Sequence, residues 1–241
     1  MQLAPNQTMK TNRTRVVKTS VTGLIAAAFL CVGLYEANAA STVATWDFTT
    51  TWTSATTVNL AGTAGAYITG TPNLNGTITG TGSTAITRVA TGGQSGAYMQ
   101  FNPQTSGNGQ PMQFTLQLTA GAPMSGFTIS YYGRVSATTA ADTQSWAYST
   151  DGGANWTTLT TQPGTLTTTW TQYTVTPNVS VASGTVWFRN TLSGATANNQ
   201  NTEFDTISIT AVPEPVNVAL GVFGLSAVVV GVGRRYLRKR A

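Results

Sequence analysis

The sequence contains no histidine, a single cysteine and few charged residues, which make up 8% of the chain. Without histidine, the Ser-His-Asp and Cys-His arrangements that activate a nucleophile are excluded, as is zinc bound by imidazole. The single cysteine, Cys31, lies in a leader that we expect to be removed. The mature chain would then have no thiol and no disulfide, so packing and hydrogen bonding alone must stabilise its fold.

Positive charge is absent from most of the chain, although the whole sequence has 12 Lys and Arg against 7 Asp and Glu. Most of the basic residues lie in two terminal clusters. Between Ser41 and Val212, three arginines stand against five acidic residues, which gives a net charge of −2. A body without a basic patch excludes nucleic acid as its partner.

The first 39 residues have the three parts of a secretory signal peptide. A basic start is followed by an apolar stretch over 21–34 and by the small-x-small sequence from Ala37 to Ala39. We expect signal peptidase to cleave after Ala39.

The last thirty residues, 212–241, combine a rigid motif, an apolar run and a basic cluster. Pro213, Glu214 and Pro215 precede an apolar run over 216–233. At about 1.5 Å rise per residue, such a run spans a bilayer core of about 30 Å as a helix. The basic residues that follow are Arg234, Arg235, Arg238, Lys239 and Arg240. Because Lys and Arg stay on the cytoplasmic side, everything before Pro213 is expected outside.

This order of motif, span and basic cluster resembles the PEP-CTERM sorting signal of Gram-negative bacteria that make exopolysaccharide. The resemblance implies a transient anchor in the inner membrane and recognition by an exosortase, which removes the tail. It also implies delivery to the cell surface or to the extracellular matrix. The alternative is an ordinary single-span anchor that is never cut.

Residues 40–211 are predicted to form one all-β domain. The segment is rich in Thr, Ser, Gly and Asn, but its regularly placed aromatic and β-branched residues favour sheets over a disordered stalk. Apolar and polar residues alternate cleanly over 112–119 and 125–135, which predicts strands with one wet face. Closely spaced strands without a helical period predict an antiparallel two-sheet sandwich, jelly-roll-like, with another Greek-key sandwich as the alternative.

Ser149, Asp151, Gly153 and Trp156 fit the pattern S-x-D-x-G-x-x-W and resemble an Asp-box. In such a turn the carboxylate accepts backbone N–H groups, the glycine adopts a conformation that other residues avoid, and the tryptophan packs over the hairpin. We interpret the segment as a folding device, with a sugar-related activity as the alternative.

Four outward side chains suggest a glycan-binding site. If Phe127, Ile129 and Tyr131 point inward, Tyr132 and Arg134 point outward. Trp187 and Arg189 do the same if Val186 and Phe188 are core, although the opposite parity stays open for 185–191. Aromatic rings stack on the apolar faces of sugars, with polar groups beside them. If the two strands are neighbours, Tyr132, Arg134, Trp187 and Arg189 lie together.

Two acidic residues break the pattern of the last strand. Glu203 and Asp205 share a side with Ile207 and Ile209 by simple alternation, so either a bulge shifts the register or the acids lie at the end of the sandwich. With Asp47 they form a candidate calcium site, because carboxylate oxygens suit this ion. Exposed carboxylates at a strand end are the alternative. No other cofactor is expected.

Together these features predict a non-enzymatic exported protein, a structural or adhesive component of the exopolysaccharide or biofilm matrix. The segments VWFRN (186–190) and TEFDTISIT (202–210) resemble the final strands of bacterial secreted jelly-roll domains, many of them carbohydrate-binding or lectin-like. A carbohydrate-binding module is therefore the alternative. A glycan-cleaving enzyme, which needs two carboxylates, is more remote.

Overall fold

The computed structural model describes residues 39–78, 85–102, 112–197 and 200–214. Every regular element in these ranges is a β-strand, as predicted. None of the described segments is a helix long and apolar enough to span a membrane. The predicted signal peptide and the apolar run of the tail lie outside the described residues.

The larger of two antiparallel sheets has seven strands. Five follow the order β11-β8-β13-β1-β3, while β6 pairs with both β13 and β5. The strands are β1 (Ser41–Trp46), β3 (Thr63–Ala64), β5 (Ala85–Val89), β6 (Tyr98–Asn102), β8 (Met124–Val135), β11 (Thr171–Val175) and β13 (Thr202–Pro213). The first and last of these strands, β1 and β13, are hydrogen-bonded neighbours.

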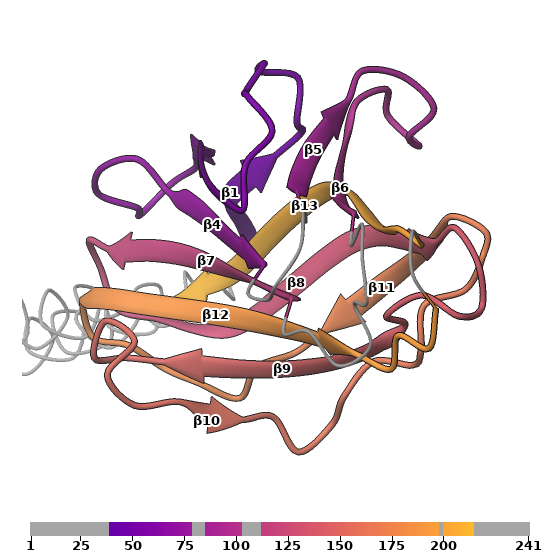
Figure 1. Cartoon of the computed structure of the whole chain (residues 1–241). Coiled ribbons are helices and arrows are strands. Elements are labelled where there is room, and N and C mark those ends of the chain that lie inside the picture. The colour runs from indigo at the N-terminus through magenta and orange to yellow at the C-terminus, as the bar shows by residue number, and fades with distance from the viewer. Residues whose placement is uncertain (1–38, 79–84, 103–111, 198–199, 215–241) are drawn as a thin grey trace, which may run out of the picture. The chain divides into compact units, whose positions relative to one another are not determined.

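The second sheet has six strands in the order β10-β9-β12-β7-β4-β2. Figure 1 shows its longer strands, β7, β12 and β9, lying side by side. The strands are β2 (Thr57–Ala61), β4 (Asn73–Ile78), β7 (Met112–Ala120), β9 (Thr143–Ser149), β10 (Thr157–Thr158) and β12 (Gly184–Ser193). Most connections along the chain pass from one sheet to the other, which agrees with the predicted jelly-roll-like sandwich.

Aromatic side chains from both sheets meet in one core. Phe114 on β7 lies 4.9 Å from Phe204 on β13 and 5.5 Å from Trp146 on β9, measured between ring centroids. Phe101 on β6 packs against Phe204 at 6.0 Å. The Tyr131 hydroxyl, also in this core, accepts a hydrogen bond from Trp146 Nε1 and donates one to Gln144. The two sheets are therefore joined by packed rings whose polar groups are satisfied.

The predicted inward residues of the two best-defined strands are buried. Phe127, Ile129 and Tyr131 on β8 are at most 1% exposed, and Val186 and Phe188 on β12 are fully buried. The parity of 185–191, which the sequence left open, is thereby determined. Trp187 and Arg189 point outward from the six-stranded sheet.

Strand β13 contains a β-bulge, which was one of the two predicted explanations for the position of Glu203 and Asp205; the other placed the acids at the end of the sandwich. The register between β13 and β8 shifts between Asp205 and Ser208, and Thr206 has a φ of 42°. The extra residue lets Phe204 and Ile207 both face the core, while the two acids point to the other side of the sheet.

The last strand ends inside the predicted sorting motif. Pro213 is buried and pairs with Met124 of β8. The backbone N–H of Glu214 then donates a hydrogen bond of 2.9 Å to the carbonyl of Pro123. The sandwich therefore continues up to the second residue of the motif.

We expect the substitution Phe114→Ala to lower the free energy of unfolding by about 3–5 kcal/mol, because it leaves a cavity at the centre of the aromatic core. Thr119→Ala, at an exposed position of the same strand, is the matched control and should change it by less than about 0.5 kcal/mol. Urea denaturation followed by circular dichroism measures both. Equal losses in the two variants would show that the ring cluster does not hold the sheets together.

Candidate functional site

The turn between β9 and β10 has the hydrogen bonds of the predicted Asp-box. Asp151 Oδ1 accepts from the backbone N–H of Asn155 at 2.9 Å and from the Ser149 hydroxyl at 2.7 Å. The Ser149 oxygen in turn accepts from the backbone N–H of Gly153 at 2.9 Å. Gly153 has a φ of 88°, which other residues rarely adopt. These contacts tie the serine, the aspartate and the glycine of the motif to one another within a single turn.

This turn also builds a surface on the six-stranded sheet. The Arg189 guanidinium lies 4.2 Å from the centre of the Trp156 ring, which is a cation-π contact. A Cβ atom on Gly153 would come within 2.9 Å of the Trp187 ring, so only glycine lets the turn lie this close to the indole. Trp156, Trp187 and Arg189 therefore form one cluster.

Carboxamide side chains continue this cluster across the sheet. Outward residues on β12, β7 and β4 are Trp187, Gln117 and Asn73 in one row, and Arg189, Thr115 and Asn75 in the next. Because neighbouring strands lie about 4.8 Å apart, each row spans about 10 Å. Gln113 extends the surface further along β7. We call this surface the amide-tryptophan face, made of Asn73, Asn75, Gln113, Thr115, Gln117, Trp156, Trp187 and Arg189.

The polar groups of this face have few partners within the protein. The side chains of Asn73, Asn75, Gln113 and Gln117 are half-buried, and none makes a hydrogen bond to another described residue. Arg189 Nε is buried and also lacks a partner in the described ranges. Each carboxamide both donates and accepts, so the face offers unused groups of both kinds beside its rings. Burial lowers the pKa of Arg189, but the ordinary pKa of a guanidinium is so far above neutrality that Arg189 remains a cation at pH 7.

The structure separates the four residues predicted to form one glycan-binding site. Tyr132 and Arg134 lie on β8 of the seven-stranded sheet, whereas Trp187 and Arg189 lie on β12 of the six-stranded sheet. All four point away from the core, so the two pairs lie on opposite faces of the sandwich. The prediction of a single site was wrong because the two strands are not neighbours. Only the pair on β12 belongs to the amide-tryptophan face.

On the opposite face, Arg134 is engaged within the protein. It forms an ion pair with Glu203 and stacks on Trp170, with its guanidinium carbon 4.6 Å from the ring centre. Trp170 Nε1 donates to the carbonyl of Gly92 at 3.0 Å, and its ring packs edge-on against Tyr98 at 5.3 Å. These groups already have partners, whereas the carboxamides of the amide-tryptophan face make no hydrogen bond to any residue that the structure describes.

The three carboxylates of the predicted calcium site are not brought together. Glu203 pairs with Arg134, and the fully buried Asp205 accepts from the backbone N–H and the hydroxyl of Ser95, at 2.8 and 2.7 Å. Asp47 remains exposed. Across the described ranges, no cluster of three or more His, Cys, Asp or Glu side chains could hold a metal. The bulge in β13 turns both acids toward other partners, and neither is exposed as the alternative expected.

Sequence reasoning missed the four carboxamides. The alternation over 112–119 indicated that Gln113 and Gln117 face outward. Nothing in the sequence indicated that β7 lies between β12 and β4, which is what places these amides beside Trp187. Trp156 was assigned to its turn but not to a surface.

No protein-family model and no curated protein matches this sequence. Among solved structures, the chain is similar to the CBM22-1 xylan-binding domain of Paenibacillus barcinonensis Xyn10C, with a TM-score of 0.42 and 13% identity over 74% of this chain and 99% of that one. TmCBM61 in complex with β-1,4-galactotriose gives a TM-score of 0.36, with 12% identity over 58% and 88%. The enzymatically active domain of tailspike protein 4 of bacteriophage CBA120 gives 0.37, with 12% identity over 55% and 19%. With TM-scores below 0.5, these similarities assign neither a family nor a ligand.

The stability of the turn should depend on pH through the ionisation of the Asp151 carboxylate. The backbone N–H of Asn155, followed by the Ser149 hydroxyl and the Asn155 side chain, lowers the pKa of Asp151 to about 2. A carboxylate with a lowered folded pKa stabilises the fold above its unfolded value near 3.8, and this contribution is lost as the pH falls through 2. We therefore expect the melting temperature to fall between pH 4 and pH 2, and Asp151→Asn to reduce this fall.

Thermal unfolding at the two pH values measures this effect. Asp142→Asn is the control, because that carboxylate accepts from the neighbouring Thr143 hydroxyl outside the turn. If Asp151→Asn and Asp142→Asn show the same acid sensitivity, the turn does not depend on the charge of Asp151.

Proposed function

We propose that this is an exported, non-catalytic protein that binds polysaccharide through the amide-tryptophan face. The observation that carries the proposal is the set of half-buried carboxamides beside Trp187 and Trp156, which have no hydrogen-bond partner among the described residues. Indole rings stack on the apolar faces of pyranoses, and carboxamides donate to and accept from sugar hydroxyls. Two rows of such groups extend over several strands, which suits a chain of sugar units.

Polysaccharide binding is compatible with a structural or adhesive role in the matrix. A protein that holds polysaccharide at the cell surface contributes to the cohesion of the matrix, so the structural or adhesive role becomes a consequence of the binding. The amide-tryptophan face favours this order, because it provides unpaired groups for a ligand. A purely structural component would not need them.

Hydrolysis of glycans is the less favoured function. Glycosidases use two carboxylates that flank the scissile bond. Glu203 is paired with Arg134, Asp205 is buried under Ser95, and Asp151 is held in its turn. The amide-tryptophan face contains no carboxylate.

Gln117→Ala should weaken binding to the polysaccharide of the producing cells by about 3- to 10-fold, because it removes one donor and one acceptor from the centre of the face. Trp187→Ala should weaken it by tenfold or more through loss of stacking. Affinity electrophoresis in gels containing the purified polysaccharide measures both. Melting temperatures establish that each variant is folded.

Tyr132→Ala is the matched control, since this half-buried aromatic residue lies on the opposite face. It should bind as the wild type does. If Gln117→Ala and Trp187→Ala retain full affinity while folded, the amide-tryptophan face is not the binding site. Release of reducing ends from the polysaccharide during incubation would instead favour the enzymatic alternative.

We further propose the route of export that the two ends resemble. Signal peptidase would remove residues 1–39, and an exosortase would act on the tail after transient anchoring in the inner membrane. The protein would then reach the cell surface or the extracellular polysaccharide.

Intact-mass spectrometry of the protein recovered from the matrix tests this route. The mass should be below the 25.1 kDa of the full chain by the leader and by part of the tail, including the basic residues 234–240. A mass that retains residues 216–241 would instead identify a permanent anchor.

A further inference from the structure

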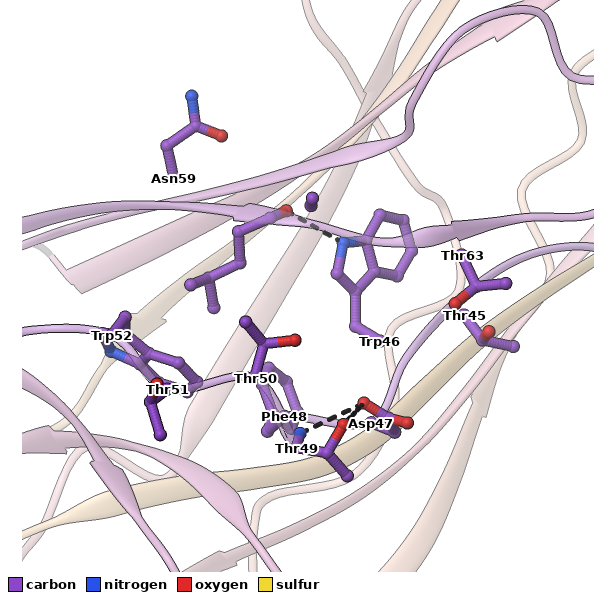
Figure 2. Close-up of a pocket in the computed structure, with 12 residues that line it drawn as sticks. Thr45, Trp46, Asp47, Phe48, Thr49, Thr50, Thr51, Trp52, Asn59 and Thr63 are labelled. Atoms are coloured by element: carbon purple, nitrogen blue, oxygen red, sulfur yellow. Dashed lines mark hydrogen bonds between the residues drawn. The ribbon is translucent and has the colours of Figure 1, made fainter.

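A pocket of about 350 Å³ lies where β1 ends, apart from the amide-tryptophan face. Figure 2 shows it between the segment that follows β1 and strand β2. Its lining residues are Thr45, Trp46, Asp47, Phe48, Thr49, Thr50, Thr51, Trp52, Asn59, Leu60, Ala61 and Thr63. We call it the threonine pocket. None of these residues belongs to the amide-tryptophan face.

The threonine pocket combines an apolar base with a rim of hydroxyl groups. Trp46 and Phe48 are 2% and 4% exposed, so their rings lie at the base, and Trp52 packs edge-on against Phe48 at 6.0 Å. The residues 49–51 are consecutive exposed threonines. Rings on one side and hydroxyls on the other match the two kinds of surface that a sugar ring presents.

The wall of the pocket is held in place by specific contacts. Phe48 has a φ of 56°, which is unusual for a residue other than glycine. Arg88 on β5 donates to the carbonyl of Phe48 at 2.7 Å and to that of Thr49 at 3.1 Å. Asp47 accepts from the backbone N–H and the hydroxyl of Thr49, as Figure 2 shows. Strained backbone held by its surroundings is frequent at ligand sites, and a preformed wall reduces the entropy lost on binding.

Two features limit the choice of ligand. The first is the indole ring of Trp52, which is half-buried and gives the wall an apolar surface beside the hydroxyl groups. The second is Asp47, the one charged residue among the described lining residues, with the Arg88 guanidinium outside the lining on the carbonyls of Phe48 and Thr49. The backbone N–H of Thr49, and then its hydroxyl, lower the pKa of Asp47, which is ionised at neutral pH as an ordinary aspartate is. Its negative charge opposes anionic ligands, while its oxygens accept from hydroxyl groups.

We propose that the threonine pocket binds a single neutral sugar unit, such as the end of a polysaccharide chain. Its volume is near the lower limit of about 300 to 1,000 Å³ for ligand pockets, which suits one ring rather than an extended chain. The choice of a sugar as ligand rests on the proposed function. The pocket itself can fail or succeed independently of the amide-tryptophan face.

Methyl glycosides of glucose, galactose and mannose, with the glucuronic and galacturonic counterparts, are the probes for the full chain. Saturation-transfer NMR and tryptophan fluorescence should detect binding of at least one neutral glycoside at millimolar concentration. Its uronic counterpart should bind about tenfold more weakly or not at all, and Asp47→Asn should reduce this discrimination.

Two pocket variants and one control variant locate the binding. Trp52→Ala removes a ring from the wall and should weaken binding by tenfold or more. Thr51→Tyr, at an exposed position, should fill the pocket and abolish binding without changing the melting temperature. Tyr132→Ala lies outside both the threonine pocket and the amide-tryptophan face and should leave glycoside binding unchanged.

The proposal is overturned if no neutral glycoside binds, or if binding survives both Trp52→Ala and Thr51→Tyr. Loss of polysaccharide binding in Gln117→Ala would still support the proposed function in either case. Retained polysaccharide binding in Gln117→Ala and Trp187→Ala, with glycoside binding lost in Thr51→Tyr, would leave the threonine pocket as the sugar site.

Discussion

The packing of aromatic rings between the two sheets is the interaction on which this structure depends. The described sandwich has no disulfide, so the contact of Phe114 with Phe204 and Trp146 must keep the sheets in register. The same packing determines what reaches the surface. Each inward ring fixes the alternation of its strand, and Phe188 at the core of β12 therefore obliges Trp187 and Arg189 to point outward. The candidate binding surface follows from the requirements of the core.

The two outer faces of the sandwich share one kind of contact but differ in the partners of their polar groups. On each face an arginine stacks on a tryptophan, Arg134 on Trp170 and Arg189 on Trp156. Arg134 has a carboxylate partner, and Trp170 is tied to the loop that contains Gly92. Within the part of the chain that the structure describes, Arg189 has no carboxylate partner and the carboxamides beside it make no hydrogen bond. The polar groups around Arg134 are therefore occupied by contacts within the protein, whereas those around Arg189 are available to a ligand.

The sequence allowed the strands, their inward faces and the Asp-box turn to be predicted, because each depends on residues close together in the chain. It did not allow the pairing of strands to be predicted, which depends on contacts between distant segments. Tyr132 and Trp187 were therefore placed on one surface, although their strands belong to different sheets. The bulge at Thr206 was foreseen as one of two possibilities from the mismatch between Asp205 and Ile207. The partner of Asp205, Ser95, lies 110 residues away and left no local signal.

The end of β13 has a consequence for any enzyme that acts on the tail. Pro213 is part of the strand and Glu214 is hydrogen-bonded to Pro123, so the folded sandwich and the Pro-Glu-Pro motif share their residues without a spacer. A peptide normally enters a protease in an extended form with both edges of its backbone accessible. Here one edge is already occupied by β8. For an enzyme to reach the motif, the last residues of the strand must therefore detach from β8 first. The accessibility of the motif then depends on the local stability of the sheet as well as on the sequence of the motif.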